Sequence, residues 1–276
     1  MKAALLQLNV SDDPAANLAG TLEMLRDAAG QGAEFVLTPE VTNCLSTSRA
    51  HQDIVLQHER DDATLKALSA AAAELGTWLL IGSLALKTDA ADGRFANRSL
   101  LISPAGAVVA HYDKIHMFDV QISPEETFRE SDAYRPGEQA VVAHTPFARI
   151  GMSICYDLRF PMLYQALADA GAEILTVPAA FSPVTGAAHW HALLRARAIE
   201  TGCFVLAPAQ TGEHASAAHK TRSTYGHSLV VAPWGEVLLD AGERPGVYMF
   251  DLDMDQVGSA RQRVPSMANR RAFTDP

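Results

Sequence analysis

The stretch that decides the fold reads RIGMSICYDLRFP and runs from Arg149 to Pro161. Its first six residues form a short apolar run, which predicts a buried strand that ends at Cys155. Pro161 suits the first turn of a helix. Its ring fixes φ at a helical value, and it lacks only a backbone N–H, which at this position would have no acceptor within the helix. A helix is therefore predicted from Pro161 to Gly171, where glycine favours termination. A strand that leads directly into a helix is the repeating unit of layered α/β folds.

The same alternation of strand and helix continues on both sides of this stretch. Upstream, Asp13 before Pro14 predicts a helix N-cap, and the apolar spacing that follows predicts a helix up to Gly30. The other predicted elements are strands at 3–10, 34–38, 78–81, 173–178 and 203–207, helices at 65–75 and 189–201, and a hairpin at 99–110. Residues 118–146 are predicted to be irregular. No linker separates the halves, so we expect one α/β domain over 1–276, with two sheets packed together beneath helices.

Composition limits the possible partners. The 276-residue chain carries 22 basic and 32 acidic residues, a net charge of −10. Nucleic acids and anionic lipids need a basic face, so we expect neither as the main partner and a small molecule instead. No apolar run approaches the length of a membrane span. Three cysteines give no disulfide framework, which predicts a reducing cytoplasm.

Three ionisable residues follow predicted strands: Glu40, Lys114 and Cys155. Catalytic groups of α/β folds gather where strands end, so these positions favour a functional role. Each residue also has a structural interpretation. Glu40 follows a proline and fits a cap or a surface charge, Lys114 follows a hairpin and fits a solvated position, and Cys155 fits core packing. Spacing alone leaves these alternatives open.

The surrounding motifs decide between the alternatives. They are TPE at 38–40, YDKIHMFD at 112–119 and CYDLRFP at 155–161. Together and in this order they resemble the nitrilase (carbon–nitrogen hydrolase) superfamily, and the resemblance runs over essentially the whole chain. It places the family's Glu–Lys–Cys triad on Glu40, Lys114 and Cys155. It places the family's second glutamate on Glu130, within FRES at 128–131.

The resemblance also implies an architecture and a class of substrate. The family fold is a four-layer α-β-β-α sandwich, in which two mixed sheets pack face to face with helices outside. A homodimer, or a higher homo-oligomer, built through helices is implied as well. We expect an amidase that acts on a small amide in the cytoplasm, without cofactor or metal.

The chemistry of amide hydrolysis supports these residue types. A cysteine thiol is mostly protonated at pH 7, so a nucleophilic Cys155 needs a base or a cation beside it. Glu40 can take the thiol proton and later give it to the departing amine. The ammonium of Lys114 and the backbone N–H of Tyr156 can stabilise the tetrahedral oxyanion. Glu130 would offset the charge of Lys114 and orient the amide or the water, and the product would form through a thioester.

Segments downstream of Cys155 narrow the resemblance to one branch, the Nit amidases. They are GAEILT at 171–176, FSPVTG at 181–186, LRARAIE at 194–200 and YGHS at 225–228. Members of this branch hydrolyse deaminated glutathione or α-keto-acid amides, and the RFP after the cysteine leans toward deaminated glutathione. Nitrile-cleaving members typically carry Trp after the cysteine, so Tyr156 favours amide cleavage.

Both candidate substrates carry a carboxylate, for which an arginine fork is a natural partner. We expect Arg159 to bind it, with an Asp157–Arg159 ion pair as an equal alternative. Phe181 and His189 are further candidates near the pocket mouth, and His189 also fits a residue at a helix start. His189 and His191 do not predict a metal site, because residues two apart on a helix point to different faces and no third ligand has suitable spacing.

Other functions stay open on sequence alone. An ω-amidase or an N-carbamoyl amino-acid hydrolase would use the same site on another amide. A non-catalytic interaction protein could keep the scaffold, but it has no physical reason to keep the four ionisable residues together. A Cys–His hydrolase needs a histidine near Cys155, and none of the ten lies in a recognised thiol-protease context. We expect Cys203 to be core, and the basic tail at 261–271 to pack against a partner subunit.

Overall fold

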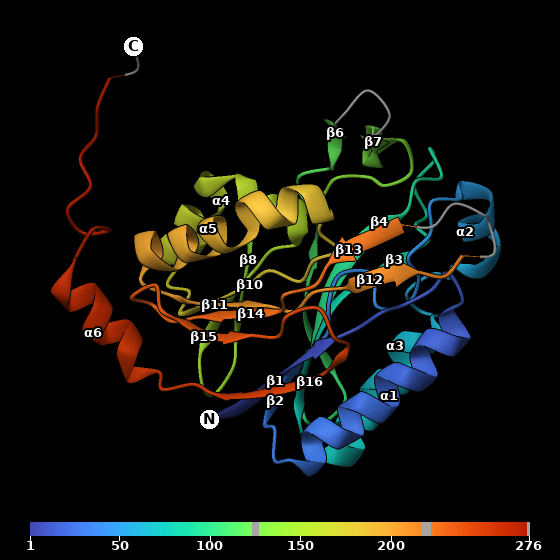
Figure 1. The fold of residues 1–276 in the computed structure, drawn as a ribbon, viewed down its shortest axis with the longest axis horizontal. Coiled ribbons are helices and arrows are strands. Elements are labelled where there is room, and N and C mark those ends of the chain that lie inside the picture. The colour runs from blue at the N-terminus through green and yellow to red at the C-terminus, as the bar shows by residue number, and fades with distance from the viewer. Residues whose placement is uncertain (123–126, 217–221, 275–276) are drawn as a thin grey trace.

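A computed structural model describes residues 1–122, 127–216 and 222–274. Two six-stranded sheets form its centre (Figure 1). The first contains β1 (Lys2–Gln7), β2 (Phe35–Leu37), β3 (Trp78–Leu86), β4 (Ala96–Ile102), β5 (Val108–Asp113) and β16 (Gly246–Asp251), in the order β16-β1-β2-β3-β4-β5. The second contains β8 (Val141–His144), β9 (Arg149–Met152), β10 (Ile174–Thr176), β11 (Phe204–Ala207), β14 (Leu229–Val231) and β15 (Val237–Asp240), in the order β15-β14-β11-β10-β9-β8. Both sheets are mixed, because each has three parallel strands extended by antiparallel neighbours.

Helices and two small hairpins complete the chain. The helices are α1 (Pro14–Gly30), α2 (Arg49–Val55), α3 (Ala63–Leu75), α4 (Pro161–Asp169), α5 (Pro183–Thr201) and α6 (Asp255–Arg263). Short 3-10 helices lie at Glu130–Asp132 and Cys155–Arg159. The hairpins pair β6 (Asp119–Gln121) with β7 (Thr127–Arg129), and β12 (Thr211–His214) with β13 (Arg222–Tyr225). Within the described ranges, no helix is long and apolar enough to cross a membrane.

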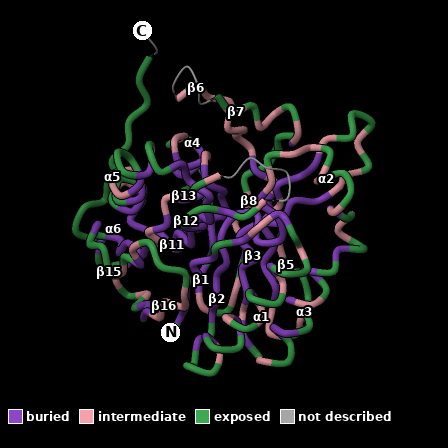
Figure 2. Tube along the Cα trace, turned by 45° about the vertical axis from the view of Figure 1, so that its right-hand side comes forward, coloured by how far each residue is buried: buried purple, intermediate pink, exposed green. Residues whose placement is uncertain are grey.

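Neighbouring residues of the central strands face different layers. In β1, Leu5 belongs to the apolar cluster that contains the strands of the second sheet, while Leu6 belongs to the cluster that contains Leu25 of α1 and Leu68 of α3. This follows from the two-residue period of a strand. Figure 1 shows α1 and α3 on the outside of one sheet and α4 and α5 on the outside of the other, and the strands between them are mostly buried (Figure 2). The expected four-layer α-β-β-α sandwich is therefore confirmed.

Local signals set several boundaries as predicted. The side chain of Asp13 caps α1 by accepting the N–H groups of Ala15 and Ala16. Helix α3 ends at Gly76, whose φ of 65° is left-handed and suits glycine. The predicted hairpin is formed by β4 and β5, with Gly106 in its turn at a φ of 76°. These boundaries depend on residues next to each other in sequence, and this is why sequence alone could predict them.

Three sequence predictions need correction. Helix α5 begins at Pro183, six residues before the predicted start, because Pro183 occupies the first helical position, where its fixed φ favours a helix. Helix α2 was not predicted, although Ser48 caps it through the N–H of His51. Residues 118–146 are not wholly irregular, since they contain β6, β7, the 3-10 helix at Glu130–Asp132 and β8. Elements of three or four residues carry too little periodicity to be recognised.

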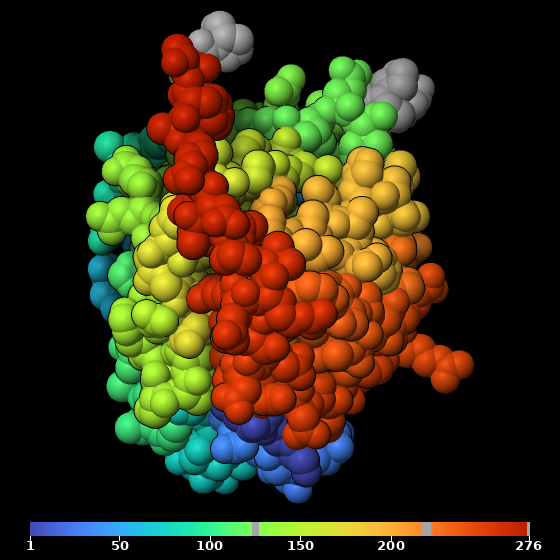
Figure 3. All heavy atoms as spheres, turned by 90° about the vertical axis from the view of Figure 1, so that its left-hand side faces the viewer, coloured from blue at the N-terminus to red at the C-terminus, as the bar shows by residue number. Residues whose placement is uncertain are grey.

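The C-terminal part of the chain returns to its beginning. Strand β16 pairs antiparallel with β1, with Lys2 opposite Asp251 and Gln7 opposite Gly246. Helix α6 and the segment after it lie on the outside of the molecule, and Figure 3 shows the segment running along this face toward the C-terminus. Its contact with a partner subunit stays a prediction.

Gly82 allows the ends of the two sheets to approach each other. A Cβ at this position of β3 would lie 2.0 Å from the carbonyl oxygen of Thr38, 2.6 Å from that of Pro39 and 2.5 Å from Cβ of Pro178. Thr38 and Pro39 lead into Glu40, while the carbonyl of Pro178 accepts the N–H of Cys155 at 2.9 Å. The spacing between the two predicted catalytic segments therefore depends on the absence of a Cβ at Gly82.

Replacing Gly82 by alanine is expected to lower the free energy of unfolding by about 3 kcal/mol, because backbone atoms must move to admit the methyl group. We expect kcat to fall as well, since Glu40 and Cys155 would be displaced. Gly20→Ala is the matched control: Gly20 lies in α1 with nothing within 4 Å of an added Cβ. Urea unfolding should find this variant as stable as the parent or more stable. A Gly82→Ala protein with unchanged stability would contradict the close approach.

Candidate active site

Glu40 lies three residues beyond β2 and is only 4% exposed. Its Oε1 accepts hydrogen bonds from Nζ of Lys114 at 2.9 Å and from Nδ2 of Asn97 at 2.8 Å. Its Oε2 accepts the backbone N–H of Ala180 at 2.9 Å. Burial alone would raise the pKa of this carboxyl, but the charge and the hydrogen bond of Lys114 lower it below the ordinary value. Glu40 is therefore held ionised inside the protein.

Lys114 directly follows β5 and is 2% exposed. Besides the bond to Glu40, its Nζ donates to both carboxylate oxygens of Glu130 at 2.9 Å. Burial alone would lower the pKa of the ammonium group, but the charges of Glu130 and Glu40 raise it well above its usual range. Two carboxylates therefore keep one buried lysine charged.

Cys155 follows β9 on a sharp turn, where its φ of 49° is left-handed. A β-carbon makes this conformation strained, and such strain concentrates at functional sites. The Glu40 carboxylate lies close enough to the thiol for the two groups to shift each other's pKa. Burial and the negative charge of Glu40 raise the pKa of the thiol well above 9.0, although Lys114 opposes them. The resting site thus pairs a neutral thiol with a carboxylate that can accept its proton.

Glu130 and Asn97 complete the cluster. Glu130 begins a 3-10 helix, and its Oε2 also accepts the N–H of Phe118 at 2.6 Å. Asn97, in β4, donates from Nδ2 to Glu40 and, at 3.4 Å, to Glu130. Its Oδ1 is buried without a hydrogen-bond partner among the described residues. The sequence predictions missed Asn97, although a polar residue beside the apolar run of the hairpin was a signal that could have found it.

Asp157 joins the segment of Lys114 to the turn of Cys155. This fully buried carboxylate accepts bonds from Tyr112 Oη at 2.7 Å, from the backbone N–H of His116 at 3.0 Å and from that of Ile154 at 2.8 Å. Nδ1 of His116 lies 2.7 Å from the same carboxylate. Asp157 therefore ties the end of β5 to the end of β9, a positioning role that the sequence predictions missed.

Arg159 lies against His189 and not against Asp157. Its Nη1 is 3.2 Å from Nδ1 of His189, and its guanidinium group lies over the rings of Phe181 at 5.4 Å and Tyr156 at 6.0 Å. The predicted substrate residues thus contact one another. Tyr156 and Phe181 line the pocket described below, whereas Arg159 and His189 are not among its lining residues.

A pocket of about 730 Å³ opens over the cluster. Glu40, Lys114, Glu130 and Cys155 all line it. Three arginines also do so, and they are Arg49, Arg129 and Arg222. Nη2 of Arg222 donates to the carbonyl oxygen of Ala180 at 2.7 Å, and its guanidinium group lies 5.6 Å from the centre of the Phe128 ring. Because these arginines face the pocket of an otherwise acidic chain, the pocket suits an anionic ligand.

The other two cysteines have different surroundings. Cys203 is buried at the start of β11, and its thiol lies 3.2 Å from the carbonyl oxygen of Ala172. Cys44 lines the pocket, but burial and then the charges of Asp12 and Asp13 raise the pKa of its thiol to about 12. Neither thiol has the carboxylate and ammonium pair found beside Cys155.

Comparisons with known proteins agree with this geometry. The chain matches the family Carbon-nitrogen hydrolase over residues 2–262. It is 38% identical to the deaminated glutathione amidase of Yersinia enterocolitica, over 97% of this chain and 92% of that protein. The solved structure of the C. elegans NitFhit protein has a TM-score of 0.88 at 33% identity, covering 98% of this chain and 65% of that one.

A second solved structure is an amidase from Nesterenkonia sp. AN1, in a Glu-to-Gln mutant. It has a TM-score of 0.79 at 26% identity, covering 98% of this chain and 94% of that one. In that protein the acetamide moiety of fluoroacetamide is attached covalently to the active-site cysteine. The fold, the family match over most of the chain and these relatives lead to one conclusion: the chain belongs to the carbon–nitrogen hydrolase (nitrilase) superfamily and is an amidase.

Proposed function

We propose that this amidase hydrolyses deaminated glutathione, with Cys155 as nucleophile. The observation that carries the proposal is the buried contact of Cys155, Glu40, Lys114 and Glu130 at the base of a pocket that also presents arginines. The substrate is suggested by the relative from Yersinia enterocolitica, which is named for it. A cysteine nucleophile is also supported by the covalent adduct in the Nesterenkonia amidase.

In the first half-reaction Sγ of Cys155 attacks the amide carbonyl while Glu40 takes the thiol proton. The carbonyl π bond breaks, and its electron pair becomes an oxyanion. Nζ of Lys114 and the backbone N–H of Tyr156 stabilise this charge. When the tetrahedral intermediate collapses, the C–N bond breaks and Glu40 gives its proton to the departing amine. A thioester on Cys155 remains.

The second half-reaction hydrolyses the thioester. Glu40, again ionised, takes a proton from water as the water oxygen attacks the carbonyl carbon. Lys114 stabilises the second oxyanion in the same way. Collapse breaks the C–S bond, the sulfur recovers a proton from Glu40, and a carboxylic acid leaves. Glu130 balances the charge of Lys114 throughout and fixes the position of its ammonium group.

Deaminated glutathione is a dicarboxylate, and the arginines of the pocket give it suitable partners. Arg222 donates to the Ala180 carbonyl, and Ala180 in turn donates its N–H to Glu40, so this arginine lies close to the reacting groups. We propose that Arg222 binds one carboxylate, and that Arg159 with His189 shapes the wall behind Phe181 and Tyr156.

The substrate assignment is tested with steady-state assays of released amine or ammonia on three amides. These are deaminated glutathione, an α-keto-acid amide as substrate of an ω-amidase, and an N-carbamoyl amino acid. Deaminated glutathione is expected to give the highest kcat/KM. A higher kcat/KM for either of the other two amides would show that this amide is the preferred substrate. No turnover of any amide would favour the interaction-protein alternative.

Arg222→Gln is expected to raise KM for deaminated glutathione by about 10- to 100-fold, because a charged hydrogen bond to carboxylate is lost. An uncharged amide assayed with the same variant shows whether Glu40 has moved, since its kcat/KM should stay near the parent value. Arg60→Gln is the control variant, because Arg60 forms ion pairs with the surface residues Asp61 and Asp89 and does not line the pocket. Equal losses on charged and uncharged amides would argue against a carboxylate contact.

The pH profile separates this mechanism from a Cys–His pair. Because the pKa of Glu40 lies below 4.5, the base stays ionised until the pH falls below that value. Because the pKa of the Cys155 thiol lies well above 9.0, the thiol stays protonated up to at least that pH. We therefore expect kcat/KM to be flat between about pH 5 and pH 9, whereas a histidine base would give an acidic limb near pH 6.5. Circular dichroism at each pH checks that the chain remains folded.

A further inference from the structure

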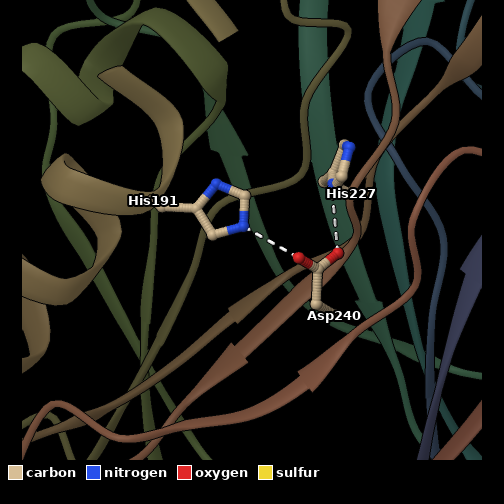
Figure 4. Close-up of side chains that lie close together, drawn as sticks. All are labelled: His191, His227 and Asp240. Atoms are coloured by element: carbon tan, nitrogen blue, oxygen red, sulfur yellow. Dashed lines mark hydrogen bonds and ion pairs between the residues drawn. The ribbon is translucent and has the colours of Figure 1, made fainter. Parts of the chain in front are cut away.

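Two histidines and one aspartate from different elements meet on the surface beside α5 (Figure 4). His191 lies in α5, His227 lies between β13 and β14, and Asp240 ends β15. Nε2 of His191 is 2.9 Å from Oδ2 of Asp240, and Nδ1 of His227 is 2.8 Å from Oδ1 of the same carboxylate. One ligand atom from each residue lies within 4.8 Å of the others. Over the ranges that the structure describes, this is the one group of three His, Cys, Asp or Glu residues with such spacing.

The backbone and the ring of His227 are both held in place. Its φ of 55° is left-handed, its N–H donates to the carbonyl of Gly242 at 2.7 Å, and its carbonyl accepts Nε1 of Trp190 at 2.8 Å. Its imidazole stacks on the ring of Tyr225, with centroids 4.5 Å apart. Trp190 directly precedes His191, so the bond to its indole also fixes the two histidines relative to each other. A pre-organised pair of imidazoles is what a metal site needs.

Asp240 supplies the negative charge. Besides the two imidazoles, its Oδ1 accepts the N–H of Gly242 at 2.9 Å, so the backbone fixes the orientation of the carboxylate. The carboxylate of Asp240 thus lies directly beside two imidazoles, and this set of donor atoms favours a cation.

We propose that His191, His227 and Asp240 bind a Zn²⁺ ion. Zinc accepts imidazole nitrogen and carboxylate oxygen at about 2.0–2.2 Å in tetrahedral geometry, which places neighbouring ligand atoms about 3.3 Å apart. The present N···O separations of 2.8 and 2.9 Å, each to a different oxygen of Asp240, need to open only slightly, and the ligand atoms already lie within 4.8 Å of one another. All three side chains are partly exposed, so water can take the fourth position.

Spacing along the chain predicts no metal site at His189 and His191. The structure shows that His189 contacts Arg159, whereas His191 faces a partner 49 residues away in sequence. The ligands of this site come together through tertiary folding. No motif in the sequence predicts that these three residues lie together.

A metal at this site would fasten α5 to the strands beneath it. The first residues of α5, Pro183 to Thr185, line the pocket, and so does Arg222 at the start of β13. Asp240 and His227 would bind the same ion from the strands beneath α5. The ion would thus stabilise one wall of the pocket without touching the reacting atoms. A structural metal of this kind raises stability and leaves the chemistry to Cys155.

The full chain is first stripped with EDTA and then titrated with ZnCl₂ by calorimetry. We expect one ion per chain with micromolar Kd, and a higher Tm in the presence of zinc. His191→Ala, His227→Asn and Asp240→Asn should each weaken binding by about tenfold or more and reduce the rise in Tm. Asparagine is chosen at position 227 because it tolerates the left-handed φ. Circular dichroism shows that each variant is folded before titration.

His58→Ala is the matched control, because His58 lies 3.6 Å from Asp89 but belongs to no group of three possible ligands among the described residues, and its loss should leave zinc affinity unchanged. Cys155→Ala is a second control, since a thiol in the pocket is the competing zinc ligand, and this variant should keep the parent affinity. The proposal is overturned by affinity weaker than millimolar, by binding that survives His191→Ala, or by binding that disappears in Cys155→Ala.

Discussion

Cys155→Ala is expected to reduce kcat by about 10⁴-fold or more, as loss of a covalent nucleophile does in other hydrolases. The fold should survive, because the change removes one sulfur atom and leaves the Glu40–Lys114 contact intact. Alanine keeps a β-carbon in the left-handed turn, so the strain there is unchanged. Amine release and thermal unfolding by circular dichroism measure the two effects separately.

Cys203→Ala is the matched control for this experiment. Cys203 is equally buried, but it lies against the Ala172 carbonyl outside the pocket, so its loss should leave kcat unchanged. Mass spectrometry of the parent with a slowly hydrolysed amide should find an acyl adduct on Cys155, and the Cys155→Ala protein should carry none. Activity of Cys155→Ala within tenfold of the parent would show that another group attacks the carbonyl.

Some of this site could be predicted from the sequence because its residues follow strands in short contiguous motifs. Glu40, Lys114 and Cys155 each end a segment whose neighbours identify it. Asn97 and Asp157 could not be assigned in the same way. Their roles arise from contacts across 57 and 45 residues of sequence, between Asn97 and Glu40 and between Asp157 and Tyr112.

The fold shows the same division between local and distant information. The cap at Asp13 and the end of α3 at Gly76 depend on adjacent residues and were predictable. In the sequence, Gly82 looks like any other strand residue. Only its closeness to Thr38 and Pro178 in the structure shows that a side chain does not fit at this position. The pairing of β16 with β1 joins the two ends of the chain, and no local pattern specifies such a partner.

Lys114→Met is expected to destabilise the protein by about 3–5 kcal/mol, because it leaves the buried Glu40 and the partly buried Glu130 close together without their cation. We also expect kcat to fall by about 10³-fold, since one donor to the oxyanion is lost. Methionine roughly matches the length of the removed side chain, so packing changes little. Urea unfolding at pH 7.5 and steady-state kinetics measure the two effects.

The pH dependence of stability should change sign in this variant. In the parent, the lowered pKa of Glu40 adds stability above the unfolded value of about 4.3, and this stability is lost as the pH falls through the folded value. Without Lys114, burial and the mutual repulsion of two carboxylates raise their pKa values. Stability of Lys114→Met should therefore increase as the pH falls from 7 toward about 5. A stability of Lys114→Met that stays constant or falls over that range would contradict the charge cluster.

The double variant Lys114→Met/Glu130→Gln separates charge balance from catalysis. Removing the second carboxylate relieves the repulsion, so the double variant should recover most of the stability that Lys114→Met loses. It should not recover kcat, because neither protein has the ammonium group of Lys114 to stabilise the oxyanion. Glu130→Gln alone leaves Lys114 paired with the carboxylate of Glu40. It should therefore lower stability and kcat less than Lys114→Met does. If the double variant regained both stability and turnover, Lys114 would be needed only to neutralise its neighbours, and the oxyanion would have to be stabilised by backbone N–H groups alone.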